Sequence, residues 1–389
     1  MSGGLTARRR LGGARGLSIA LALTALAPGG VAAALGPTPR APATVGYAAR
    51  APGAAAGSAA IATEPCAAGT LLVTRVPFVI DMTRCDPRSI LLKGPSGLGV
   101  MVPPDGSSVE ASVLGGRGMQ SLVVDVDLTE KRVTVSGDEP GGPWDALPTT
   151  LDDPTGGRAH APLPPPPAPS AASSRERSAA APISPCRDAA YRSDGAPLPS
   201  KGRRRPVLKW WYYPGWGPVA YLNARQRKRA FLRGTRIAVR GQNNCRLGRV
   251  SIRQVYKGST WRPPGVLRSG ACGRADGRNV RGWMRFRPGE TMLGLTCKWF
   301  RRGKMVEGDI ALNASGARWA TSKKRCRADA YDAVGVAAHE TLHHLGLAHV
   351  KGARHRKLTM FPAIDTCEFH WRTLGLGDFL GLKRLYGRR

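Results

Sequence analysis

The strongest constraint on the fold is the eleven-residue segment from His339 to His349, which reads HETLHHLGLAH. On a helix, His339 and His343 lie one turn apart on the same face, where neutral imidazoles can hold one Zn²⁺. Gly346 has no Cβ and can take the positive φ that ends a helix and turns the chain back. His349 can then supply a third ligand. The segment therefore predicts a catalytic zinc site at the end of a helix.

Glu340 directly follows the first predicted ligand. Its carboxylate can hold a water molecule at the metal and accept its proton, because zinc lowers the pKa of such a water towards neutrality. A purely structural zinc site has no need of this carboxylate, so we interpret Glu340 as a general base. His344 projects about 100° away from His343 around the helix, and we expect it to support the ligands or to lie at the surface.

Local patterns in the C-terminal half indicate an α+β domain. Helical spacing covers residues 223–239 and 332–345, with Asp332 as the N-cap of the second helix, and Asp378 is expected to cap a short terminal helix. Apolar runs at residues 250–256, 292–295 and 310–312 indicate strands between these helices. Helices and strands in this order fit the α+β class.

A later methionine extends the histidine pattern into a family resemblance. Met360, in the run LTMFP, lies eleven residues beyond His349, and HExxHxxGxxH followed by such a methionine resembles the metzincins. The Met-x-Pro form and the run LGLGD at residues 374–378 resemble the matrixins in particular. Residues from about 186 to 386, half of the chain, are similar to secreted matrixin-like peptidases of actinobacteria.

The resemblance implies a fold and an activity for residues 183–389. The fold would be a twisted, mostly parallel five-stranded sheet with the zinc helix and a C-terminal helix, and Met360 would form an apolar floor under one catalytic zinc. The activity would be hydrolysis of protein or peptide substrates. An extended substrate would bind along an edge strand near Asp309 to Asn313, and the residues after Met360 would wall the specificity pocket. No histidine lies between His160 and His339, so a second, structural zinc has no ligands there; calcium stays an open alternative.

The N-terminus predicts export. Residues 1–34 combine a basic region with Arg8, Arg9 and Arg10, an apolar run at 17–26 and small residues at 32–34, as in a secretory signal peptide. Pro28 interrupts the apolar run too early for a membrane span. We therefore expect a secreted, extracellular protein with no transmembrane segment after signal cleavage.

Composition divides the rest of the N-terminal half into three segments. Residues 35–62 are rich in Ala and Pro and are predicted to be disordered. Residues 63–138 contain short β-like runs between turn residues, which predicts a small all-β module that serves as a prodomain or a targeting module. Residues 139–182 are rich in Pro, Ala and Ser and are predicted to form a linker.

The cysteines are candidates for disulfides, because an even number in an exported chain allows all of them to pair. Cys66 with Cys85 would close the β module, and Cys326 with Cys367 is our favoured pair near the zinc helix. Cys186, in the run SPCRD, only faintly echoes the propeptide cysteine that keeps matrixins latent, so we interpret it as a disulfide partner. The eight candidates are Cys66, Cys85, Cys186, Cys245, Cys272, Cys297, Cys326 and Cys367.

The formal net charge of +33 leaves an alternative function open. No acidic residue lies between Asp194 and Asp276, and such a basic surface attracts polyanions. The chain has no zinc-finger spacing, RNP motif or P-loop, so specific nucleic-acid binding is not expected. Anionic cell-envelope polymers are candidate partners. The alternative is thus a non-catalytic protein that binds such polymers and carries a vestigial zinc site.

Overall fold

A computed structural model of the chain describes residues 69–73, 76–94, 97–115, 119–138, 181–194, 197–199 and 205–387. The expected signal peptide, the segment 35–62 and nearly all of the expected linker lie outside these residues. No helix in the described ranges has the length and apolar character needed to cross a membrane.

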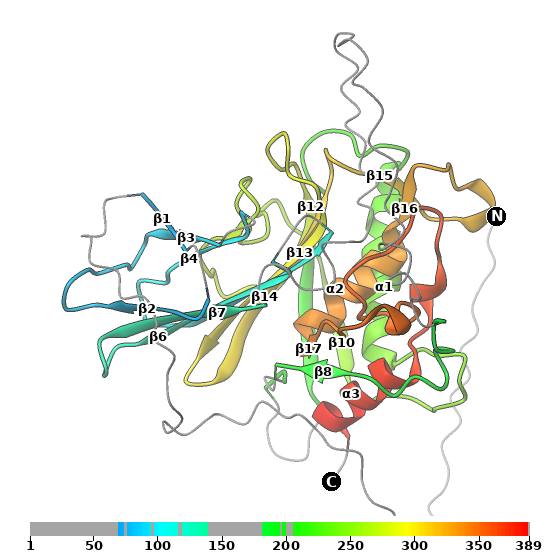
Figure 1. Cartoon of the computed structure of the whole chain (residues 1–389). Helices are drawn as coiled ribbons and strands as arrows, with labels where there is room; N and C mark the ends of the chain where they lie inside the picture. The colour runs from blue at the N-terminus through cyan, green and yellow to red at the C-terminus, as the bar shows by residue number, and fades with distance from the viewer. Residues whose placement is uncertain are drawn as a thin grey trace, which may run out of the picture. The chain divides into compact units, whose positions relative to one another are not determined.

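The largest element is a mixed sheet of nine strands (Figure 1). In spatial order they are β10 (Arg253–Ser259), β9 (Val207–Tyr213), β12 (Val280–Met284), β14 (Lys304–Asn313), β13 (Met292–Arg301), β5 (Ser108–Gly115), β6 (Ser121–Asp127), β7 (Arg132–Gly137) and β2 (Phe78–Asp81). The first four run parallel to one another, and β13 and all later neighbours pair antiparallel. Two segments distant in the sequence therefore build one sheet, joined between β13 and β5.

Helices α1 (Ala224–Arg240) and α2 (Ala333–His344) share one hydrophobic core with strands β9, β12 and β14. The helix α1 begins at Asn223, whose side chain accepts from the Gln226 amide while the Gln226 side chain accepts from the Asn223 amide, both at 2.9 Å. Gly234 lets α1 approach α2 closely, because a Cβ there would lie 2.7 Å from the Ala337 Cβ. This contact fixes the helix that carries the predicted zinc ligands.

A second core lies on strands from both halves of the chain. Leu295 and Trp299 of β13 are buried in it together with Val109 and Val113 of β5. It also includes residues of a four-stranded sheet formed by β1 (Thr70–Leu72), β3 (Leu91–Lys93), β4 (Gly99–Met101) and β11 (Ala271–Cys272). The strand β11 comes from the C-terminal half, so the two halves also share this smaller sheet.

Short elements complete the described chain. They are β8 (Arg192–Ser193), β15 (Arg318–Ala320), β16 (Ala330–Asp332), β17 (Leu347–Ala348), the 3₁₀ turns η2 (Lys323–Arg325), η3 (Ala353–His355) and η4 (His370–Arg372), and the helix α3 (Leu376–Tyr386). Asp332 is the N-cap of α2, as predicted, and accepts from the Val334 amide at 3.0 Å. Asp378 was expected to cap α3; the N-cap residue is Gly375, and Asp378 caps the helix from its first turn by accepting from the Gly375 amide at 2.9 Å.

The α+β class is confirmed, and two finer expectations change. The sheet has nine strands rather than five, because β5 and its neighbours continue it beyond β13; otherwise β13 would present unpaired backbone groups. The expected edge strand at Asp309 to Asn313 is wrong, since β14 lies between β12 and β13. The domain boundaries stay a prediction, although the strands of residues 78–137 lie in two sheets that each include strands from the C-terminal half.

Three disulfides join distant parts of the described chain. Cys186 pairs with Cys245, Cys272 with Cys297, and Cys326 with Cys367, with Cα–Cα distances of 5.2, 5.6 and 5.7 Å. Cys186 is therefore a disulfide partner, and Cys326 has the partner that we favoured. Cys85 is also disulfide-bonded, whereas Cys66 lies outside the described residues.

Candidate metal centre

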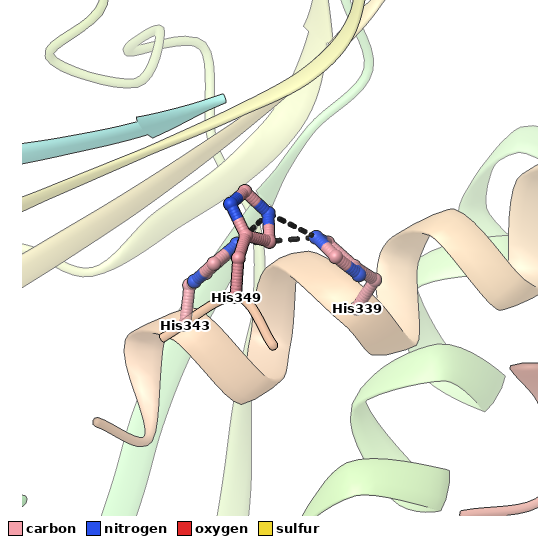
Figure 2. A group of neighbouring side chains, drawn as sticks. All are labelled: His339, His343 and His349. Atoms are coloured by element: carbon pink, nitrogen blue, oxygen red, sulfur yellow. Dashed lines mark hydrogen bonds between the residues drawn. The ribbon is translucent and has the colours of Figure 1, made fainter. Parts of the chain in front are cut away.

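Three histidines meet at the end of α2 (Figure 2). The Nε2 atom of His343 lies 3.1 Å from that of His339 and 3.0 Å from that of His349, and the third side of the triangle is 3.1 Å. After α2, Gly346 has a φ of 91° and turns the chain back. Pairing of Leu347 with Ser193 then places the next residues beside β8. The chain thereby returns His349 to the helix face that carries His339 and His343.

The backbone around the histidines selects their tautomer. The Nδ1–H of His339 donates to the Thr359 carbonyl at 2.6 Å, and that of His343 donates to the Leu347 carbonyl at 2.9 Å. Because Nδ1 carries the proton in His339 and His343, the Nε2 atom of each turns an unprotonated lone pair towards the other rings. Two lone pairs 3.1 Å apart repel each other unless a cation lies between them.

Burial keeps these histidines neutral. It is the largest cause that lowers the pKa of His339 and His343 well below the ordinary value, and the neighbouring His349 adds to it. Burial, followed by the charge of Arg192, lowers the pKa of His349 to about 3. Neutral imidazole is the form that binds a metal ion.

The triangle fits zinc. A point equidistant from the three Nε2 atoms in their plane lies about 1.8 Å from each, which is close to a Zn–N bond length of about 2.0–2.1 Å. Within the described residues, no other set of three His, Cys, Asp or Glu side chains brings its ligand atoms within 4.8 Å of one another. His339, His343 and His349 are thus the residues that could hold the ion.

Glu340 lies under strand β13. Its Oε2 accepts from the Thr296 hydroxyl at 2.6 Å, while its Oε1 is buried and has no hydrogen-bond partner among the described residues. Burial raises the pKa of this carboxyl to about 8, although the hydrogen bond from Thr296 acts in the opposite direction. Gly294 is required here, because a Cβ at this position would lie 2.4 Å from Oε1. The strand therefore fixes the orientation of the carboxylate.

A buried carboxylate supports the turn that contains Met360. Asp378 accepts from the amides of Thr359 at 2.8 Å and Met360 at 3.1 Å, and also from that of Gly375 at 2.9 Å. Since the Thr359 carbonyl orients His339, Asp378 acts on the metal centre through this turn. Burial raises the pKa of Asp378 to about 6. The sequence predicted Asp378 as a helix cap but did not indicate its hydrogen bonds to Thr359 and Met360.

Two further side chains near α2 could not be read from the sequence. Trp371 stacks on His339, with ring centroids 4.7 Å apart and planes inclined by 16°. Arg281 is fully buried, donates to the Thr341 hydroxyl at 2.8 Å and lies 3.4 Å from Nδ1 of His344. His344 is therefore buried beside Arg281, not at the surface.

The family model for matrixin matches residues 285–387. This part of the chain is similar to the matrixins, a family of zinc metallopeptidases. The match includes β13, α2, the three histidines, Met360 and α3. A search of curated proteins found none that matches the chain.

The matrixin-like segment depends on residues that precede it in the sequence. Arg281 on β12 contacts α2, and Thr235 on α1 accepts a hydrogen bond from the same guanidinium group. Ser193 pairs with Leu347 just before the third histidine. The fold around the metal centre therefore extends well beyond the matched residues.

Proposed function

We propose that the chain is a secreted zinc-dependent endopeptidase with Glu340 as its general base. The observation that carries this proposal is the buried triangle of three Nε2 atoms at 3.0–3.1 Å, with the Glu340 carboxyl on the same helix. The matrixin match over the same residues supports peptide-bond hydrolysis as the reaction.

Zinc bound by these histidines would supply a Lewis acid that polarises the scissile carbonyl and makes a water molecule easier to deprotonate. The Glu340 carboxylate accepts the proton of the attacking water and later delivers it to the nitrogen of the leaving amine. The Thr296 hydroxyl holds Oε2 at 2.6 Å, which leaves Oε1 for the water. Asp378 keeps the Thr359 carbonyl in place, and that carbonyl holds the His339 ring.

The substrate of this proposed enzyme is a protein or peptide bound in an extended form. The residues after Met360 are its proposed specificity pocket, and Phe361 and Ile364 in this segment are both buried. Their apolar character favours an apolar substrate side chain.

Secretion is part of the proposal. The basic and apolar runs of residues 1–34 are typical of a signal peptide. Disulfides form and persist in oxidising, extracytoplasmic compartments, and the three described here support the same location.

The proposal is tested with the zinc-loaded full chain and a peptide library, by sequencing the cleaved ends. Glu340→Ala should lower kcat by about 10²–10⁴-fold with zinc content unchanged, whereas the exposed Glu130, changed to Ala, serves as the control and should leave activity intact. Undiminished cleavage by Glu340→Ala would exclude Glu340 as the base. If instead no variant hydrolyses peptides but the chain binds anionic wall polymers in a salt-sensitive way, the non-catalytic alternative is favoured.

A further inference from the structure

Helix α1 exposes one of its faces to solvent. The opposite face is buried and includes Phe231, Gly234 and Ala238. The exposed face carries a row of arginines at intervals of three or four residues, namely Arg225, Arg229, Arg233, Arg236 and Arg240. At about 100° per residue, these positions lie within an arc of about 80° and extend over about 22 Å of the helix axis. We call these five residues the arginine stripe.

The arginine stripe has no counter-ions in the described part of the protein. No acidic residue lies between Asp194 and Asp276 in the sequence. In space, none of the ion pairs among the described residues includes an arginine of the stripe. Like charges one helical turn apart repel each other and destabilise a helix. A bound polyanion would remove this repulsion.

The positive charge continues beyond the end of α1. Gly241 ends the helix with a φ of 59°, and the Val250 amide then donates to the Arg240 carbonyl at 3.2 Å. The loop between Gly241 and Val250 therefore begins and ends at the last turn of the helix. It exposes Arg246 and Arg249. The cationic surface is thus longer than the arginine stripe itself.

Arginine, rather than lysine, occupies every position of the stripe. The planar guanidinium group presents paired donors that match two oxygens of one phosphate group, and it stays charged at physiological pH. Arginines four residues apart are separated by a rise of about 6 Å along the helix. An extended phosphodiester polymer with short spacers can present its phosphates to these arginines in turn. A single row of charges therefore fits a linear polyanion.

Two other polyanionic partners fit this surface less well. A helix that binds an anionic membrane inserts its apolar side chains into the lipid, but the large apolar side chains of α1 pack in or against the core that it shares with α2. Proteins that bind single-stranded nucleic acid stack the bases on aromatic side chains. Phe231 is the one aromatic residue of α1, and it is fully buried. These observations favour a polymer without bases.

The arginine stripe faces away from the zinc helix. Gly234 is the residue at which α1 approaches α2, because a Cβ there would lie 2.7 Å from the Cβ of Ala337. Gly234 lies about 140° around the helix from the middle of the stripe. A polymer on the stripe is therefore separated from α2 by the body of α1.

We infer that the arginine stripe of α1 is a binding site for a linear phosphodiester polymer without bases, of the poly(glycerol phosphate) type. The contacts are ion pairs between guanidinium groups and phosphates, so binding weakens as salt is added. The inference does not depend on the proposed peptidase activity. A cell surface that carries such a polymer would retain the exported chain through α1.

The first test titrates zinc-loaded full chains with a synthetic poly(glycerol phosphate) long enough to span the stripe, at several salt concentrations. If the polymer behaves as a single-stranded nucleic acid does, five contacts give a slope of about −3.5 for the logarithm of the association constant against that of the salt concentration. The double variant Arg229→Gln, Arg233→Gln should reduce this slope to about −2 and weaken binding about tenfold or more at about 0.1 M salt. Glutamine is a good helix former, so α1 should stay folded.

A matched control separates the arginine stripe from the overall charge of the protein. The double variant Arg302→Gln, Arg325→Gln removes the same charge from exposed positions in the turn between β13 and β14 and in η2. Its slope and affinity should equal those of the wild type. Equal losses in the two double variants, or no binding by the wild type, would overturn the inference.

A second measurement identifies the polymer. Oligothymidylate, duplex DNA and polyglutamate of the same total charge are tested as competitors of labelled poly(glycerol phosphate). Each of them should need a concentration at least tenfold higher to displace half of the label. A nucleic acid that competes as well as the unlabelled polymer would assign the stripe to nucleic acid, and equally strong competition by polyglutamate would assign it to carboxylate polymers. Either result would refute the inference, whether or not the chain hydrolyses peptides.

Discussion

Replacing Lys298 by Met should destabilise the folded chain strongly. The methionine side chain has a similar length but leaves Glu110 and Asp194 without the cation that both contact. All three side chains are buried or nearly so, with exposed fractions of 0% for Lys298, 8% for Glu110 and 12% for Asp194. Breaking a buried ion pair by removing one partner costs about 3–5 kcal/mol. We expect a loss of this size in the free energy of unfolding at pH 7.

The loss should depend on pH in a defined direction. Burial already raises the pKa of Glu110 in the wild type, and Lys298 opposes that rise; without Lys298 the pKa of the carboxyl rises further. A carboxyl whose pKa is higher in the folded state than in the unfolded state destabilises the fold when it is ionised. This destabilisation disappears as the pH falls towards the pKa of the carboxyl in the unfolded chain. Between pH 7 and pH 5 the deficit should shrink by about 1 kcal/mol or more.

The assay is urea unfolding of the zinc-loaded chain, followed by tryptophan fluorescence at both pH values. Lys304→Met is the matched control, because Lys304 is exposed at the start of β14. A deficit for Lys298→Met below about 1 kcal/mol at pH 7, well under the cost of an uncompensated buried charge, would refute the reasoning. So would a deficit that is the same at pH 5 and pH 7.

Three further predictions concern the metal centre and its surroundings. Thr296→Val removes the hydroxyl that donates to Glu340, and kcat/KM should fall about tenfold. The acid limb of the pH profile of kcat/KM should also move to higher pH, because the lost hydrogen bond held the pKa of Glu340 down. Unchanged profiles would assign Thr296 no role at the base. Zinc binding to the metal-free wild type at pH 7 should release about one more proton than zinc binding to the Glu340→Gln variant, as measured by calorimetry in two buffers. The reason is that the Glu340 carboxyl has a pKa of about 8 without metal, and a nearby cation lowers this pKa. Equal proton release would contradict this. The double variant Cys326→Ser, Cys367→Ser opens a loop with a sequence separation of 41 and should lower the free energy of unfolding by about 4 kcal/mol. The thermal unfolding midpoint should fall accordingly. A midpoint equal to that of the wild type would show that other contacts hold this loop.

The features that the sequence predicted depend on nearby residues. The three histidines lie within eleven positions, and helix period together with Gly346 was enough to expect that they meet at one point. Asp332 precedes an apolar helix, and its side chain caps this helix by accepting from the amide of Val334, two residues later. Such local relations can be read from spacing alone.

The features that the sequence did not predict depend on strand order. β14 follows β13 in the chain, and the sequence analysis expected it to be an edge strand of the sheet. In the structure β14 lies between β12 and β13, and β13 pairs with β5 on its other side. No spacing rule connects Glu110 with Lys298, which are far apart in the sequence and meet only through this pairing. Trp371 reaches His339 from a 3₁₀ turn after the Met360 segment, and an isolated tryptophan in the sequence carries no sign of that contact.

The pairing of β5 with β13 also has a consequence for how the chain responds to dilution. A strand on the same polypeptide binds its neighbour at an effective concentration on the order of millimolar, however dilute the protein is. Cutting the backbone between Asp138 and Ala181 would turn β5 into a separate molecule, whose hold on β13 then weakens as the protein disperses. After a single cut, the integrity of the nine-stranded sheet would thus depend on protein concentration.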